Sequence, residues 1–190
     1  MQLFTITASF TLAAASLIAG EGADAPRGPM SDALRRFYED ARGNILAASA
    51  SMPDENFSYR PAQGVRTFGE LLGHIADGQY AFCSAVRGEP NPIPVDPTLK
   101  QIHKDSIEKS KSSPGDLRRA AREAFAYCDP AFAAATDRSL PDRVKLLNNE
   151  TSKAGVLTLS IYHLSQHYGN LVVYMRARGV APPSAPESPR

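Results

Sequence analysis

Two histidines spaced four residues apart are the side chains that first suggest chemistry in this sequence. They are His163 and His167, in the segment LSIYHLSQHYGNLVVYMRARG. On an α-helix this spacing places both imidazoles on one face, one turn apart, where they can share a metal ion. Two ligands do not complete a site, so the rest of the chain has to supply a third.

The segment 155–179 has the pattern of one long amphipathic helix. Apolar residues recur in it at helical spacing, at positions 157, 161, 164, 168, 171 and 175. Arg176 and Arg178 near its end, Gly179 after them and two prolines beyond are typical stop signals. The sequence therefore predicts a single helix that carries both histidines.

A third histidine lies on another predicted helix, which covers residues 67–88. A T-x-x-E capping box opens this helix, and a glycine ends it. His74 lies at the edge of its apolar stripe or within it, where a polar side chain needs a partner. Taken alone, His74 would be interpreted as a core histidine bonded to a backbone carbonyl. Together with His163 and His167 it becomes a candidate metal ligand.

Two more amphipathic helices are predicted, one over residues 31–51 with Ser31 as its N-cap and one that begins near residue 113. We expect Pro130 to bend or interrupt the latter. Residues 89–97, EPNPIPVDP, form a proline-rich crossover, and residues 98–111 are polar and helical in character. Residues 136–153 are interpreted as a polar connection, and no strand pattern is visible. His103 lies among lysines, and we expect it to be exposed to solvent and to have no role.

Four long helices with a proline-rich crossover predict an all-α fold, an up-down four-helix bundle over residues 31–180. In a bundle, inward side chains of different helices converge, so His74 can meet His163 and His167. Three neutral imidazoles favour zinc or nickel, with manganese or iron as alternatives, and leave one coordination position open. Glu70 and Asp77, one turn either side of His74, are candidate acceptors for its second ring nitrogen, or simply solvated side chains.

Composition excludes several other classes of protein. The net charge of +1 and the even spread of charges give no basic patch and hence no sign of nucleic-acid binding. No apolar run is long enough to span a membrane in the mature chain. There is no HExxH, Ser-His-Asp, phosphate-loop or dinucleotide-binding pattern. Cys83 and Cys128 are interpreted as two buried small side chains, with a disulfide as the alternative if the protein is exported.

Residues 1–25 have the features of a signal peptide, with a short apolar run before Ala23-Asp24-Ala25. This predicts an exported protein, periplasmic or secreted. The n-region lacks Lys and Arg, however, and translation from Met30 would give a cytoplasmic protein instead. Residues 181–190, APPSAPESPR, are expected to form a disordered tail.

The chain resembles the DinB-like (YfiT-like) superfamily of metal-dependent four-helix-bundle proteins. The resemblance lies in RTFGELLGHIADGQYAFCSAVRGEPNP, LRRAAREAFAYCDPAF and LSIYHLSQHYGNLVVYMRARGVAPPS, and covers about residues 31–184. It implies a divalent metal held by one histidine on the second helix and two on the last, here His74, His163 and His167. It also implies a homodimer in many members and, in some, a thiol S-transferase or a mycothiol-dependent isomerase. An exported protein would lie away from the cytosolic thiol pool.

Three functions remain open from the sequence. The first is a metal-dependent hydrolase or thiol S-transferase-like enzyme acting on a small molecule that the sequence does not identify. The second is a non-catalytic metal- or small-ligand-binding protein of the envelope, linked to stress. The third is a structural role for three hydrogen-bonded core histidines without a metal. A pocket that reaches the histidines would favour the first.

Overall fold

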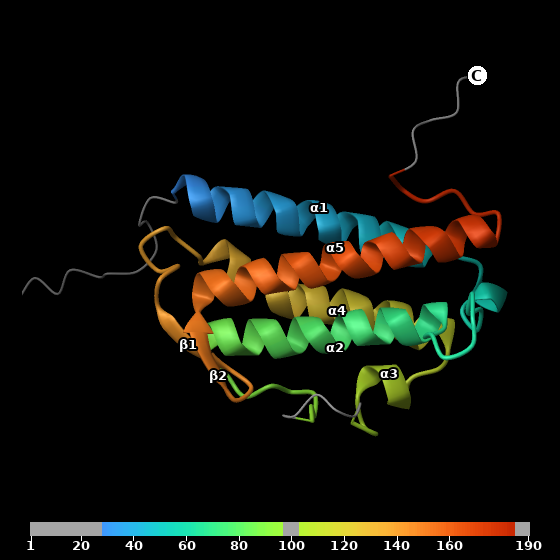
Figure 1. Ribbon diagram of the computed structural model, residues 1–190, viewed down its shortest axis with the longest axis horizontal. Helices are drawn as coiled ribbons and strands as arrows, with labels where there is room; N and C mark the ends of the chain where they lie inside the picture. Colours follow the sequence, from blue (N-terminus) through green and yellow to red (C-terminus); the bar gives the residue numbers. More distant parts are fainter. Residues whose placement is uncertain (1–27, 97–102, 185–190) are drawn as a thin grey trace, which may run out of the picture.

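The computed structural model describes residues 28–96 and 103–184 (Figure 1). The expected signal segment 1–25, residues 97–102 beside the crossover, and positions 185–190 of the expected tail lie outside the described residues. The elements are α1 (Pro29–Ser51), the 3₁₀ turn η1 (Asp54–Asn56), α2 (Phe68–Arg87), α3 (Ile107–Ser110), α4 (Pro114–Ala133), β1 (Arg143–Leu146), β2 (Asn149–Ser152) and α5 (Lys153–Ala177).

Side-chain caps set the starts of three of the long helices. Thr67, Ser113 and Ser152 each accept a hydrogen bond from the backbone N–H three residues further on, at the starts of α2, α4 and α5. Helix α1 begins slightly earlier than expected, at Pro29. Ser31, expected as its N-cap, is instead in the first turn, where it accepts a hydrogen bond from the N–H of the capping glycine.

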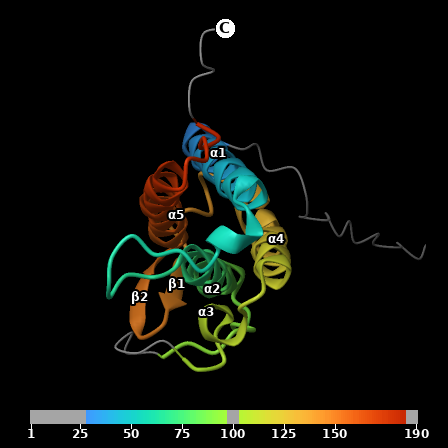
Figure 2. The ribbon, with the colours of Figure 1, turned by 90° about the vertical axis from the view of Figure 1, so that its right-hand side faces the viewer.

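The four long helices form the expected bundle. Helices α1 and α5 run in one direction, and α2 and α4 run in the other (Figure 1). Viewed end-on, α5 lies between α1 and α2 on one side, and α4 lies between them on the other (Figure 2). Because α2 and α4 are parallel neighbours, the connection between them has to return along the length of the bundle. This explains the long proline-rich crossover. No helix in the described ranges has both the length and the apolarity to span a bilayer.

A disulfide joins α2 to α4 inside the core. Cys83 and Cys128 are both fully buried, and their Cα atoms are 5.2 Å apart. The favoured interpretation of two separate buried side chains is therefore wrong, and the alternative of a disulfide holds. The two cysteines lie at almost the same distance from the starts of two parallel helices, which brings them side by side.

The segment between α4 and α5 contains a short antiparallel hairpin, in which β1 pairs with β2. This corrects the expectation of a polar connection without strands. Each strand has only four residues, and an alternation as short as Arg-Val-Lys-Leu does not stand out from a polar loop. At the turn, Leu147 has a φ of 54°, in the left-handed region that residues other than glycine rarely adopt.

Two expectations about helix extent also change. Helix α4 continues through Pro130 to Ala133, so the proline does not interrupt it. Pro130 lies in the last turn, where it removes only one hydrogen bond of the helix. Within the polar segment 98–111, the described residues form only the single turn of α3.

Candidate metal centre

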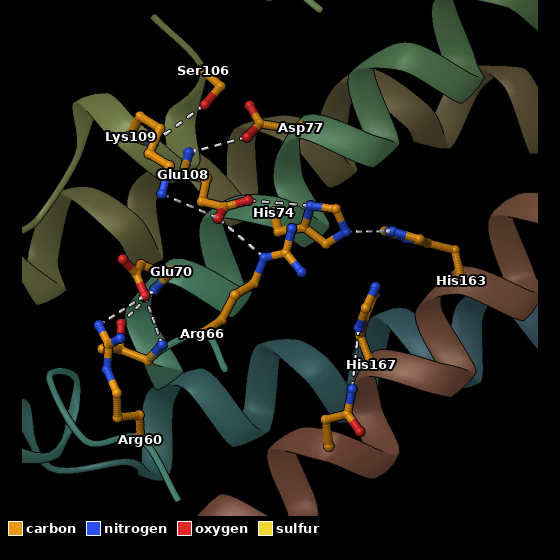
Figure 3. A network of polar contacts seen from close by, with 12 residues as sticks. Arg60, Arg66, Glu70, His74, Asp77, Ser106, Glu108, Lys109, His163 and His167 are labelled. Carbon is orange, nitrogen blue, oxygen red and sulfur yellow. Dashed lines mark hydrogen bonds and ion pairs between the residues drawn. The ribbon is translucent and has the colours of Figure 1, made fainter. Parts of the chain in front are cut away.

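Three histidines meet where α2 faces α5 (Figure 3). Nε2 of His74 lies 3.1 Å from Nε2 of His163. The ring centroids of His163 and His167, one turn apart on α5, are 4.4 Å apart. One ring nitrogen from each of the three lies within 4.8 Å of the others. The structure thus brings together all three of the candidate ligands.

The geometry of this group suits a divalent ion. With zinc–nitrogen bonds of about 2.0–2.1 Å, two ligand nitrogens of a tetrahedral site lie about 3.3 Å apart. The two Nε2 atoms of His74 and His163 are already close to that separation, and a small movement of His167 would complete the set. Within the described ranges no further His, Cys, Asp or Glu joins the group. Three protein ligands would leave one coordination position open.

The two histidines on α5 are neutral at pH 7. Burial, followed by the charges of the other two histidines, lowers the pKa of His163 to about 3. Burial, followed by the charge of His74, lowers the pKa of His167 to about 4. Both values lie well below the ordinary 6.5. Each ring therefore has a lone pair that can bind a metal without first losing a proton.

A buried carboxylate orients His74. Oε2 of Glu108 lies 3.3 Å from Nδ1 of His74, and its Oε1 lies 3.1 Å from Nε of Arg66 (Figure 3). Burial by itself would raise the pKa of Glu108, but the contact with His74 and the charge of Arg66 together lower it. Glu108 is therefore ionised at neutral pH, and its carboxylate beside Nδ1 of His74 favours a proton on that nitrogen, which leaves the lone pair of Nε2 facing the other histidines.

Neither acidic residue proposed from the sequence is the partner of His74. The Glu70 carboxylate instead accepts a hydrogen bond from the N–H of Thr67 and completes the capping box of α2. The Asp77 carboxylate accepts the backbone N–H groups of Ile107 and Glu108, at 2.8 and 3.0 Å. Asp77 acts on the site indirectly, because it fixes the first turn of α3.

A glycine allows α3 to come close enough to deliver Glu108. A Cβ atom placed on Gly73 would lie 2.8 Å from Cα and 2.9 Å from N of Glu108, which is too close for any side chain. The backbone of α3 therefore packs directly against α2, one residue before His74. Gly73 and Asp77 together explain how a single helical turn holds a buried carboxylate beside the histidines.

Packing orients His163. A Cβ on Gly78 would lie 2.7 Å from Cε1 of His163, so the imidazole occupies the space that a side chain at position 78 would fill. The ring of Phe82 packs edge-on against His163, with centroids 5.4 Å apart. Nδ1 of His163 is buried and has no hydrogen-bond partner among the described residues.

Asn170 orients His167. Its side-chain amide nitrogen lies 3.4 Å from Nδ1 of His167, and Asn170 follows His167 by almost one turn of α5. The oxygen and nitrogen of an amide group exchange places on a half-turn. With Oδ1 towards the ring, Asn170 accepts the Nδ1 proton, and Nε2 of His167 is left with a lone pair for a metal.

Two cavities reach the histidines. One, of about 700 Å³, is lined by His167 and by polar and charged residues that include Arg60, Arg66 and Lys109. The other, of about 420 Å³, is lined by His74, His163 and mainly apolar residues of α2, α5 and the hairpin. His103, which we expected to be exposed and without a role, is half-buried in the wall of the second cavity. A small molecule can thus approach the three histidines.

The model of the DinB family matches residues 30–188. The chain belongs to the DinB family. No protein of curated function matches the sequence.

Solved structures share the fold of this DinB-family chain at low sequence identity. A DinB-like protein from Bacillus cereus superposes with a TM-score of 0.62 and 17% identity, over 82% of this chain and 97% of that one. A DinB-like protein from Bacillus subtilis superposes with a TM-score of 0.59 and 19% identity, over 83% of this chain and 96% of that one. A mycothiol-dependent maleylpyruvate isomerase superposes with a TM-score of 0.60 and 17% identity, over 74% of this chain and 60% of that one. At such identities the likeness shows the fold alone.

In this DinB-family protein, sequence reasoning missed the residues that position the histidines. Glu108 lies in a polar segment between lysines and has no apolar pattern to mark it as buried. One signal for Glu108 was Ser106, a good N-cap that implies a helix start just before it. Gly73 and Gly78, on either side of His74, cost helix stability and were a second signal of close packing.

Proposed function

We propose that this DinB-family protein is a divalent-metal-dependent enzyme, a hydrolase or thiol S-transferase-like enzyme that acts on a small molecule. The observation that carries the proposal is the group of three histidines, open to two cavities that their side chains help to line. A divalent ion held by His74, His163 and His167 would supply a Lewis acid that lowers the pKa of a bound water or thiol. Zinc or nickel suits three imidazoles best, with manganese or iron as alternatives.

The residues around the histidines would serve such a site in distinct ways. Glu108 and Asn170 hold the second ring nitrogens of His74 and His167 and so fix which nitrogen faces the ion. Phe82 covers one side of His163 and helps to exclude water.

The alternative is a non-catalytic metal- or small-ligand-binding protein of the envelope, and one observation favours the location that this alternative assumes. The buried Cys83–Cys128 disulfide fits an oxidising compartment, as does the signal-like segment at residues 1–25. Export would separate the protein from cytosolic thiols. For this reason a thiol cosubstrate, suggested by the mycothiol-dependent neighbour, has less support than water.

Elemental analysis of the protein purified without a histidine tag tests metal binding. We expect about one divalent ion per chain in the wild type and none in a His163→Ala/His167→Ala variant. His103→Ala is the control and should retain the ion, because His103 lies outside the group. A trace of metal that the double variant leaves unchanged would overturn the proposal and favour three core histidines without a metal.

A screen of the metal-loaded protein then separates the two functions. Ester and amide hydrolysis and thiol transfer to electrophiles would be measured with the wild type and the double variant. Turnover that requires the histidines supports the enzyme. Stoichiometric metal without turnover of any substrate class favours the binding protein.

A further inference from the structure

The cavity beside the hairpin has an apolar wall that ends at the histidines. Ala81 and Phe82 of α2, Leu146 and Leu147 of the hairpin, and Leu159 of α5 line it together with His74 and His163. Such a wall suits a hydrocarbon or aryl group.

Leu147, one of the residues of this wall, has an unfavourable backbone conformation. Its φ of 54° is one that Asn or Gly would adopt at less cost, and hairpin turns strongly prefer those two residues. Asn148 and Asn149 follow it directly, so residues suited to the turn are close by in the chain. The leucine side chain therefore does not serve the stability of the turn. Because it lines the cavity, we infer that it provides apolar contact for a ligand.

Arg66 lines both cavities. Its Nε pairs with Glu108, and its backbone carbonyl accepts a hydrogen bond from the Tyr174 hydroxyl at 2.9 Å, which ties it to α5. The two terminal nitrogens of its guanidinium point towards the space between the histidines and donate no hydrogen bond to any described residue (Figure 3). Two parallel N–H donors in this arrangement match an oxyanion.

We propose that the ligand of this site is a small organic anion with an apolar group, whose carboxylate pairs with Arg66 while its apolar group fills the hairpin cavity. The proposal rests on the proposed function and names its class of substrate. Acidic groups also line the cavity, but Asp77 is occupied by two N–H groups of α3, and Asp96 belongs to the proline-rich crossover after α2. A phosphate monoester shares the same oxyanion chemistry and is therefore one arm of the test.

Isothermal titration of the full chain tests this class of ligand, with butanoate, hexanoate, octanoate, octyl phosphate and 1-octanol as probes. The titrations are made with zinc-loaded protein and with protein treated with a chelator. We expect the affinity to rise about fourfold for each added methylene until the cavity is filled. Octanoate should bind about tenfold or more tightly than octanol, because only the acid pairs with Arg66. Octyl phosphate binding more tightly than octanoate would overturn the carboxylate assignment.

Two variants separate the head-group and tail contributions. Arg66→Gln should weaken octanoate binding about tenfold or more and leave octanol binding unchanged, a pattern that a merely structural role of Arg66 would not give. Leu147→Asn should weaken octanoate and octanol alike, while the melting temperature stays the same or rises because the turn is relieved. Arg36→Gln, on the exposed surface of α1, and Asn148→Ala, at the tip of the hairpin, are matched controls and should change neither affinity.

The outcomes distinguish this inference from the proposed function. Binding of octanoate that depends on Arg66 and Leu147 in the chelator-treated protein supports the ligand class, even if the protein proves to bind no metal. Equal affinity for butanoate, octanoate and octanol overturns it, even if the three histidines bind zinc.

Discussion

Glu108 is the residue on which the orientation of His74 depends. Only 1% of its side chain is exposed, and it is surrounded by Arg66, His74 and Lys109. A buried carboxylate is costly unless it is paired, and here its partners lie on α2, on the segment before α2 and on α3 itself. The carboxylate therefore links the short helix to the histidine group.

Replacing Glu108 with Gln should weaken metal binding about 10- to 100-fold, because the neutral amide no longer fixes the Nδ1 proton of His74. Competition with a chromogenic chelator measures the affinity. Glu123→Gln is the matched control, since that side chain is exposed on α4. Equal zinc affinity in the Glu108 variant and the wild type would show that packing alone orients His74.

A substitution at Gly78 tests whether the absence of a side chain there positions His163. In Gly78→Ala the new Cβ would overlap the His163 ring, so we expect metal affinity to fall although alanine favours the helix by about 0.5–1 kcal/mol. Gly169→Ala on α5 is the control, because no atom lies within 4 Å of its Cβ position. It should stabilise the fold by a similar amount and leave metal affinity unchanged. If both variants retain the metal equally, Gly78 does not position His163.

At the scale of elements, the segment after α4 holds the beginning of α1. The Asp137 carboxylate accepts hydrogen bonds from the N–H groups of Ser31 and Met30, at 2.7 and 3.3 Å. These N–H groups lie in the first turn of α1 and have no partner within the helix. One end of the bundle is thus closed by a side chain that is distant in sequence.

This contact predicts a pH dependence of stability. The bond from the Ser31 N–H is the main cause that lowers the pKa of Asp137 below its ordinary 3.8. Because the folded-state pKa is lowered, the stabilisation is complete above about pH 4 and is lost as the pH falls through the folded value. Thermal unfolding of Asp137→Asn should therefore show a lower melting temperature than the wild type at pH 7 and a shrinking difference below pH 4. Asp40→Asn, on the exposed face of α1, should show neither effect, and a constant difference at all pH values would contradict the argument.

At the scale of the whole molecule, the parallel arrangement of α2 and α4 decides the topology. It requires the long crossover, and it places α3 beside the histidine group as the crossover returns. It also brings Cys83 and Cys128, which are 45 residues apart in sequence, into one disulfide in the core. The parallel arrangement of α2 and α4 therefore accounts both for the disulfide in the core and for the position of α3 beside the histidines.

The disulfide should stabilise the fold strongly. Closing a loop of 45 residues reduces the entropy of the unfolded chain by an amount worth about 4 kcal/mol. We expect a Cys83→Ala/Cys128→Ala variant to lose roughly this free energy of unfolding in urea. Thiol titration of the wild type in denaturant without reductant should find no free cysteine. Two free thiols under those conditions would mean that the protein does not form the bond.

The sequence alone determined the elements that have strong local signals. Helical periodicity and caps predicted the four long helices, since the boundaries depend on residues such as Thr67 and Ser113 that act on their own neighbours. The spacing of His163 and His167 on one helix, with His74 on another, was enough to predict that the three meet. The hairpin was missed because its strands are too short to show a pattern.

Only the tertiary structure decided how the histidines are held and what can reach them. Glu108, Gly73 and Gly78 act across helix contacts, and Arg66 and Leu147 line cavities that exist only when distant segments pack together. Such contacts leave no periodic trace in the chain. Local hydrogen bonds and apolar spacing thus determine the helices and which helix carries each histidine. Long-range packing determines the orientation of the histidine rings, the disulfide and the shape of the site.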